Sequence, residues 1–434
     1  MSGLQRAANI PELRKRILFT LSMLAVYRMG VQIPTPGING DALSEFFRDS
    51  SDTLFGMFNM FSGGALENFS IFALGIMPYI TASIVISLLT VVVPQLETLK
   101  KEGESGRRKI TQYTRYGTVV LSIIQGFFIA TGLETMSSPS GSAIVIEPGL
   151  QFKLMTMLTL TSGTAFIMWL GEQMTERGIG NGISLIIFAG IVARGPAAVA
   201  NSIPLIKAGE IPLFFVPFIL IFMFAIVAVI VFFETSQRRI PVQYAKRVVG
   251  NRMYGGQSSH LPLKINTAGV IPPIFASSLM MFPTTIGQFI QIDWVQRLSA
   301  ALSPGTIYYY ILFVAMIVFF CFFYTAVQFK PDDVAENLKK NGGFVPGIRP
   351  GKKTAEFLDR VLTRLTVVGS IYLSAICVLP TILISKFSIP FYFGGTALLI
   401  VVGVAIDTIS QIESHLVMRN YEGFMKQKRI RGRR

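Results

Sequence analysis

Two glycine-rich segments are the parts of this 434-residue chain that most resemble a phosphate-binding site. G-I-R-P-G-K-K-T (347–354) has the lysines and threonine of a phosphate loop. That loop needs the spacing G-x-x-x-x-G-K, however, and position 346 is proline. G-I-G-N-G (178–182) leads directly into an apolar run, which is not the context of a dinucleotide fingerprint. We therefore expect no nucleotide site.

Metal-binding and hydrolytic residue sets are also missing from the sequence. His260 and His415 lie far apart, and no H-E-x-x-H or closely spaced cysteine pair accompanies them. Cys321 and Cys377 both fall in apolar runs, which argues against a disulfide framework. No serine, histidine and acid occur at catalytic spacing. We predict a protein that is not an enzyme and that has no metal or cofactor.

The composition instead predicts a polytopic membrane protein built of α-helices. Hydrophobic residues make up 51% of the chain and charged residues 15%, against about 25% charged in soluble domains. A helix needs about 20 mostly apolar residues to cross the hydrocarbon core. Ten segments satisfy that requirement: about 17–35, 71–93, 116–134, 152–171, 183–203, 212–233, 268–290, 307–329, 366–385 and 393–413. Backbone groups in lipid must bond within their own segment, so these spans are expected to be helices.

The positive charge lies mostly on one side of these spans. If the chain crosses the membrane at each of the ten spans, six segments lie on the same side: 1–16, 94–115, 172–181, 235–267, 329–364 and 414–434. These six segments contain 32 of the 39 Lys and Arg residues. The remaining seven are Arg28, Arg48, Lys153, Arg194, Lys207, Arg297 and Lys386. The positive-inside rule then places both termini in the cytoplasm.

The net charge of +15 and the long basic loops allow two interpretations. The charge could only fix the topology and contact anionic lipid headgroups. Alternatively, it could form a docking surface for a large polyanion such as ribosomal RNA. The loop at about 235–267 has alternating residues on both sides of a turn at Tyr254-Gly255-Gly256, which predicts a hairpin. In the loop at about 329–365, P-G-I-R-P-G (346–351) would hold Arg349 on an exposed turn.

Two segments on the other side are unusual for a lipid-facing protein. F-G-M-F-N-M-F-S-G-G (55–64) is apolar but too short to cross a bilayer. It could be an interfacial or re-entrant helix, or a short helix that occupies a cavity and leaves it. The span at 268–290 contains prolines and small hydroxyl residues, which suit a helix that faces other helices or water.

Ionisable residues are rare inside the spans, which disfavours an ion-coupled transporter. Arg28 and Asp407 are the exceptions, and we expect each to make internal hydrogen bonds. Isoleucines occur at helical spacing instead, as Ile80 with Ile84 and as Ile183 with Ile187. Such pairs could be core packing, or they could line a hydrophobic constriction that blocks ions by dewetting.

Several long motifs resemble the SecY family of protein-translocation channels. They include F-S-I-F-A-L-G-I-M-P-Y-I-T-A-S (69–83), K-K-E-G-E-S-G-R-R-K-I (100–110), Q-Y-T-R-Y-G (112–117) and G-E-Q-M-T-E-R-G-I-G-N-G-I-S (171–184). Others are A-G-V-I-P-P-I-F-A-S-S (268–278), G-F-V-P-G-I-R-P-G (343–351) and P-F-Y-F-G-G-T-A-L-L-I-V-V-G-V (390–404). The resemblance runs nearly end to end and is weakest at about 135–150, 200–212 and 291–306.

The resemblance implies ten transmembrane helices in two pseudo-symmetric, inverted halves around a central pore. The halves would be 1–205 and 206–413, followed by a basic cytosolic tail, 414–434. A short plug helix would lie at about 55–67. By family motif, the pore ring would be Ile80, Ile84, Ile183, Ile187, Ile274 and Ile400.

The other implied sites follow the same motifs. Plug residues would be Phe55, Met57, Phe58, Met60, Phe61, Gly63 and Gly64. A lateral gate between the second and seventh spans, with the third and eighth alongside, would include Ser83, Ser87, Thr90, Ser277, Ser278 and Phe282. Docking of a ribosome or SecA would use Arg238, Arg239, Lys246, Arg247, Arg252 and Arg349. At the tip of the first loop, Asn251 would stand beside Arg252, where relatives often have two basic residues.

The implied function is a channel in the bacterial inner membrane that passes unfolded preproteins and releases hydrophobic segments into lipid. The implied partners are SecE and SecG as subunits, the ATPase SecA, the translating ribosome with its RNA and protein, signal sequences and preproteins, and anionic lipids. Two other classes stay open on the residues alone. A secondary transporter would need a small-solute site and midplane charges, and a ribosome scaffold would leave the six isoleucines on separate packing interfaces.

Overall fold

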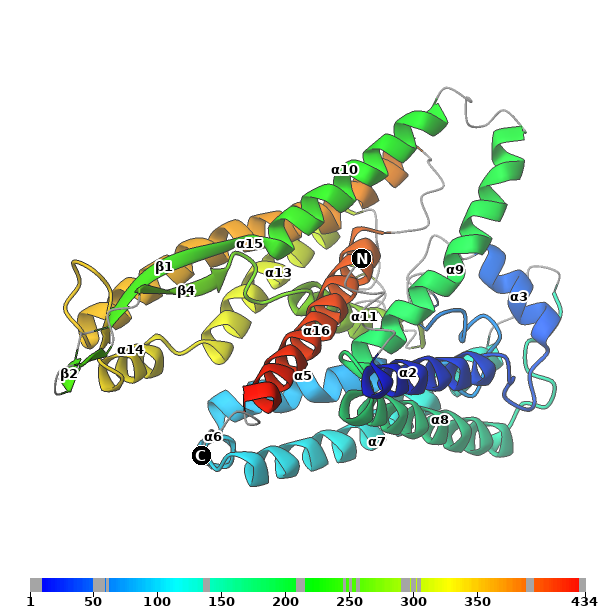
Figure 1. Cartoon of the computed structure of the whole chain (residues 1–434). Coiled ribbons are helices and arrows are strands. Elements are labelled where there is room, and N and C mark those ends of the chain that lie inside the picture. Colours follow the sequence, from blue (N-terminus) through cyan, green and yellow to red (C-terminus); the bar gives the residue numbers. More distant parts are fainter. Residues whose placement is uncertain are drawn as a thin grey trace. The chain divides into compact units, whose positions relative to one another are not determined.

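The computed structural model describes residues 10–49, 59, 62–135, 141–207, 215–244, 247–249, 252–254, 258–289, 297, 302, 306–387 and 394–428. Its helices are α2 (Pro11–Gly30), α3 (Gly40–Asp49), α5 (Met77–Val92), α6 (Pro94–Lys101), α7 (Glu104–Thr135), α8 (Leu150–Arg177), α9 (Gly182–Lys207), α10 (Phe215–Thr235), α11 (Ile271–Phe289), α13 (Ile307–Gln328), α14 (Pro331–Lys340), α15 (Lys352–Phe387) and α16 (Gly395–Lys428). Its strands are β1 (Gln237–Tyr244), β2 (Arg247–Val249), β3 (Arg252–Tyr254), β4 (Ser258–Lys264) and β5 (Gly343–Phe344). The fold is mostly helical (Figure 1).

The apolar helices support a chain that crosses a membrane several times. Within the described residues, five helices are long and apolar enough to cross: Glu104–Glu134, Leu150–Arg177, Ile307–Lys340, Lys352–Pro380 and Gly395–Val417. A sixth is obtained if α5 and α6, which meet at a bend of 98°, are counted as one broken span. Shorter apolar helices cover Gly182–Pro196, Leu220–Thr235 and Ile271–Met280. Every predicted span overlaps a described helix, but the number of crossings stays a prediction.

Helix α10 exposes several large apolar side chains. Phe224 is 75% exposed, Ile221 68% and Phe232 64%. Burying a large apolar side chain stabilises a soluble protein by about 1.5–3 kcal/mol, so water-soluble proteins rarely leave such side chains open in a row. The exposed apolar face suits lipid or a partner helix.

The chain forms two compact units, each described here by itself. Unit 1 comprises Met1–Ile211, Ser278–Thr306 and Ile400–Arg434. In it α7 packs against α5 and α8, while α8 also packs against α2 and α9 (Figure 1). A buried cluster includes Leu43 of α3, Phe69 and Leu160 of α8.

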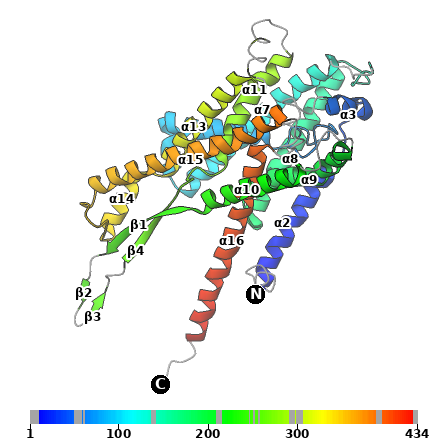
Figure 2. The same cartoon turned by 90° about the horizontal axis from the view of Figure 1, so that it is seen from above.

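Unit 2 comprises Pro212–Ser277 and Ile307–Leu399, and in it α13, α14 and α10 pack against α15 (Figure 2). The strand order is β4-β1-β5, and both pairings are antiparallel. Along β1, Ile240 and Val242 are buried while Arg239 and Pro241 are exposed, which is the period of two expected for a half-buried strand. Ile240 packs in a cluster with Leu358 of α15, so the sheet is held on the end of that helix.

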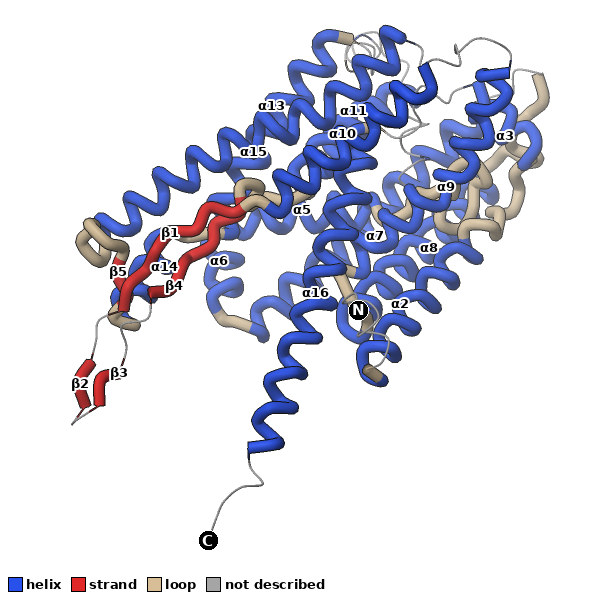
Figure 3. The backbone as a smooth tube through the Cα atoms, turned by 45° about the horizontal axis from the view of Figure 1, so that its top comes forward, coloured by secondary structure: helices blue, strands red, loops and turns tan. Residues whose placement is uncertain are grey.

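The predicted hairpin is present, and one residue of the glycine-based turn, Tyr254, lies in a strand. β1 pairs with β4 from Gln237 to Gln243, and β2 pairs with β3 beyond them (Figure 3). Arg247 pairs with Tyr254 and Val249 with Arg252, so the chain reverses between Val249 and Arg252. Tyr254 is therefore a strand residue and not part of the final turn. The prediction from the glycines was wrong at Tyr254, and Gly255 and Gly256 lie outside the described residues. The tip implied by the family resemblance, beside Arg252, agrees with the observed register.

Candidate functional site

The basic residues predicted for docking lie in unit 2 on the hairpin and on the turn before α15. Arg238 and Arg239 are exposed on β1. Arg349 is exposed on a turn between Gly347 and Gly351, whose φ angles are +79° and +100°. The Thr354 hydroxyl donates to the Arg349 carbonyl at 3.0 Å, which braces that turn. Among the described residues, no ion pair involves any of these three arginines.

Two further residues predicted for docking belong to the outer part of the same hairpin. Arg247 lies in β2 and Arg252 lies in β3, at opposite ends of the ladder that those strands form. Lys246 falls outside the described residues. The structure thus puts five of the six basic positions on one hairpin or its neighbouring turn, and their binding role stays a prediction.

The predicted pore-ring isoleucines lie on four helices. Ile80 and Ile84 are buried on α5, while on α9 Ile187 is buried and Ile183 is half-buried. These four and Ile400, which is buried on α16, belong to unit 1. Ile274 is half-buried on α11 and belongs to unit 2. Convergence of the six on one constriction stays a prediction.

The predicted gate residues lie on α5 and α11. On α5, Ser83 and Ser87 are half-buried, and the buried Thr90 donates its hydroxyl to the Ser87 carbonyl at 2.7 Å. On α11, Ser277 and Ser278 are buried, and Phe282 lies one turn further along the helix.

Each of the two helices predicted to form the gate contacts one of the helices expected beside it. Helix α5 packs against α7 in unit 1. In unit 2, Phe275 of α11 meets Phe320 of α13 edge-on, with their ring centroids 5.6 Å apart. These contacts support the expected neighbours and leave the gate itself a prediction.

Most of the predicted plug lies outside the described residues, namely Phe55, Met57, Phe58, Met60 and Phe61. Gly63 and Gly64 are described and lie in the turns between Ser62 and Phe69. Their φ angles are +68° and +90°, a region that side chains with a Cβ rarely adopt. A Cβ on Gly63 would lie 2.7 Å from the Gly190 Cα of α9, so this glycine permits close approach of two backbones.

The turn G-I-G-N-G has a structural task that the sequence reasoning missed. The Ile179 amide donates to the Thr20 hydroxyl of α2 at 3.1 Å, and the Gly180 amide donates to Gln411 of α16 at 2.9 Å. The Gly182 amide donates to Thr175 at 2.9 Å. These amides bind protein oxygens, so the turn joins α2, α8 and α16. Its only sequence signal was the run of glycines.

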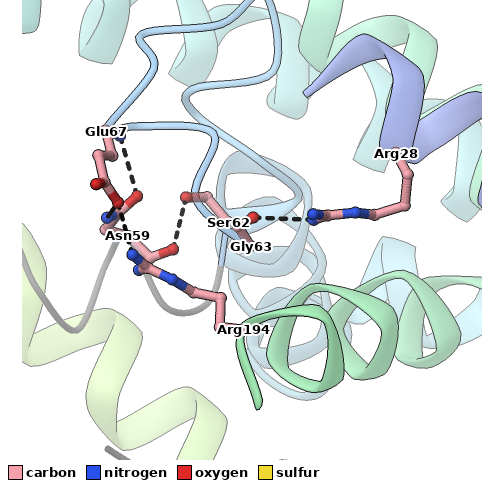
Figure 4. A network of polar contacts seen from close by, with 6 residues as sticks. All are labelled: Arg28, Asn59, Ser62, Gly63, Glu67 and Arg194. Atoms are coloured by element: carbon pink, nitrogen blue, oxygen red, sulfur yellow. Dashed lines mark hydrogen bonds and ion pairs between the residues drawn. The ribbon is translucent and has the colours of Figure 1, made fainter. Parts of the chain in front are cut away.

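A polar network around Glu67 was also missed. Arg194 of α9 donates to the Glu67 carboxylate at 2.6 Å, and Arg28 of α2 donates to the Gly63 carbonyl at 2.9 Å (Figure 4). The expectation that Arg28 makes an internal hydrogen bond is confirmed. One feature of the sequence could have pointed to this network: Arg28 and Arg194 are two of the seven basic residues outside the six basic segments.

Comparison with known proteins assigns the chain to a family. The model of the SecY family matches residues 70–409, well over half of the chain. The chain belongs to the SecY family. Among its relatives, the protein translocase subunit SecY of Escherichia coli K12 is 52% identical over 428 residues, covering 98% of this chain and 96% of the relative.

Solved structures share the SecY fold of this chain at low identity. A structure described as a protein-conducting channel has a TM-score of 0.66 at 17% identity, covering 96% of this chain and 98% of the other. Sec61 from a canine ribosome–channel complex of the endoplasmic reticulum has a TM-score of 0.62 at 16% identity, with coverage of 96% and 98%. The fold of this SecY-family chain is therefore that of the SecY and Sec61 channels.

The types of the described side chains show what interactions they offer. No group of three or more His, Cys, Asp or Glu residues in the described ranges could hold a metal ion. The predicted site residues are isoleucines, small hydroxyl residues and basic residues.

Proposed function

We propose that this chain is the protein-conducting subunit of a bacterial Sec translocon. It passes unfolded preproteins across the inner membrane and releases hydrophobic segments sideways into lipid. The observation that carries the proposal is the 52% identity with the Escherichia coli SecY translocase subunit along 98% of the chain. The fold shared with protein-conducting channels agrees with it.

The proposed architecture is ten spans in two inverted halves, 1–205 and 206–413, around an hourglass pore. Ile80, Ile84, Ile183, Ile187, Ile274 and Ile400 form the pore ring. Isoleucine suits this position because an apolar ring blocks hydrated ions by dewetting and forms no strong bond to the chain that passes. The short apolar segment near 55–67 is the plug.

Lateral release would take place between α5 and α11. Ser83, Ser87 and Thr90 on one helix and Ser277 and Ser278 on the other are short and polar. Small hydroxyl residues let helices approach closely and exchange hydrogen bonds. Pro272 and Pro273 lie in the first turn of α11, where their missing amides cost no intrahelical hydrogen bond.

The driving force would come from partners, with SecE and SecG as fellow subunits and both chain termini in the cytoplasm. The ATPase SecA or a translating ribosome would dock on the hairpin and the Arg349 turn, where exposed guanidinium groups meet phosphate or carboxylate. The canine Sec61 structure with its ribosome supports such a partner by fold. Signal sequences and preproteins are the substrates, and anionic lipids contact the basic loops.

Ion conductance in planar bilayers tests the proposal. Purified protein with its SecE-like partner should be silent, and deletion of residues 57–65 should make it conduct, because the seal loses its plug. Deletion of residues 137–140, in another loop on the same predicted side, is the matched control and should stay silent. If the intact and the deleted protein both stay silent even with a signal peptide present, the pore is refuted and a ribosome scaffold is favoured.

A further inference from the structure

The network in Figure 4 fastens one short turn of unit 1 to two helices. Within the turn, Glu67 is bonded to Asn59 twice. The Asn59 side-chain amide donates to the Glu67 carboxylate at 3.1 Å, and the Glu67 backbone amide donates to the Asn59 side-chain oxygen at 3.0 Å. The Gly64 amide donates to the Asn59 carbonyl at 2.9 Å. These bonds tie Asn59 to Gly64 and Glu67 of the turn.

Two side chains of helix α2 hold the turn by donating hydrogen bonds to backbone carbonyls of the turn. The buried Tyr27 hydroxyl donates to the Ser62 carbonyl at 3.0 Å, and Arg28 donates to the Gly63 carbonyl at 2.9 Å. Any residue at positions 62 and 63 offers a carbonyl, so these two bonds do not depend on the side chains of the turn. They set where the turn lies.

Helix α9 holds the same turn by charge. Arg194 reaches Glu67 at 2.6 Å, the short distance typical of a charge-assisted bond. Both side chains are about one-third exposed, so water and salt can compete for the ion pair. The bond is thus strong enough to hold the turn and accessible enough to be released.

We propose that Glu67 and Arg194 are positioning residues that keep the resting channel closed by fastening the turn at Ser62–Glu67 to α9. This inference rests on the proposed function. The described residues 62–67 form the end of the plug segment expected at about 55–67, so bonds from these residues to α2 and α9 limit where that end of the plug can move. Breaking the ion pair leaves the α2 bonds in place and lowers the free energy needed to move the turn.

A variant series on the full chain with its SecE-like partner tests the fastening. Glu67→Gln keeps the shape and removes the charge. Glu67→Arg and Arg194→Glu each place like charges together, and the double exchange restores an opposite pair. Glu134→Gln is the matched control, because Glu134 forms an ion pair with Lys153 at 2.9 Å that does not include the turn.

Two readouts separate the fastening from the pore. The first is the rate at which a water-soluble maleimide labels a thiol introduced by Ala65→Cys, since Ala65 is fully buried in the turn. The native Cys321 and Cys377 are buried and give the background rate. The second readout is the basal conductance of the same variants in planar bilayers.

Glu67→Gln should raise both the labelling rate and the basal conductance roughly three- to tenfold, as expected for loss of a partly exposed ion pair with its hydrogen bonds. The double exchange should bring both values back toward those of the parent, and Glu134→Gln should change neither.

Unchanged labelling in Glu67→Gln overturns the fastening. Faster labelling without a change in conductance, in a protein that still conducts with a signal peptide, overturns the claim that the fastening keeps the channel closed. A protein that conducts under no condition refutes the proposed function instead, and the labelling result still decides the fastening.

Discussion

Two arginines of unit 1 and two of unit 2 have opposite surroundings. In unit 1, Arg28 and Arg194 are bonded to a backbone carbonyl and to a carboxylate. In unit 2, Arg238 and Arg349 are exposed, and no ion pair among the described residues includes them. A guanidinium whose donors are used inside the protein holds structure together. One whose donors face solvent is available to a partner.

The largest expected effect tests how closely the turn of unit 1 fits α9. Gly63→Ala places a Cβ 2.7 Å from the Gly190 Cα, whereas Gly64→Ala meets nothing within 4 Å. Both substitutions strain a positive φ by about 1–2 kcal/mol, but only the first also forces two backbones apart. Overpacking of this kind costs about 2 kcal/mol.

The rate of maleimide labelling in the Ala65→Cys background measures this difference. Gly63→Ala should label roughly thirtyfold faster than Gly64→Ala, which corresponds to about 2 kcal/mol. Equal rates in the two variants would show that the turn does not need close approach to α9.

The second-largest effect is expected when one arginine of each unit is substituted and both labelling and ribosome binding are measured. Arg28→Met leaves the Gly63 carbonyl without its charged donor, which should cost about 1–3 kcal/mol and speed labelling in the turn roughly tenfold. Arg238→Met should leave labelling unchanged, because exposed substitutions stay within about 0.5 kcal/mol. For ribosome binding the order should reverse, with Arg238→Met weakening the affinity and Arg28→Met not. A single variant that changes both measurements would remove the contrast between the units.

The smallest effect is the salt dependence of docking. Arg349→Gln should reduce the slope of log affinity for ribosomes against log salt by about 1, if the guanidinium contacts one phosphate. The double substitution Lys353→Gln with Glu356→Gln removes an exposed ion pair of 3.0 Å and leaves the net charge unchanged. It should leave the slope as it is. An unchanged slope in Arg349→Gln would exclude this turn from the docking surface.

Local patterns predicted much of the fold. Hydrophobic runs located the helices because each run is a property of neighbouring residues, and alternation along 238–245 and 259–266 located the hairpin. The glycine-based turn was wrong at Tyr254, which is a strand residue, because strand register depends on pairing across the hairpin. The exposure of Arg349 was predicted correctly, since prolines and glycines determine a turn locally.

The sequence by itself determined the membrane character, the helical class, the family and the basic loops. Only the tertiary structure decided which arginines are bonded. Arg28 meets a carbonyl 35 positions away, and Arg194 meets a carboxylate 127 positions away. No periodic pattern connects residues that distant, because their meeting depends on how α2 and α9 pack around the turn. The physical reason is that composition and periodicity are summed over neighbours, whereas a charged bond requires two particular atoms within about 3 Å.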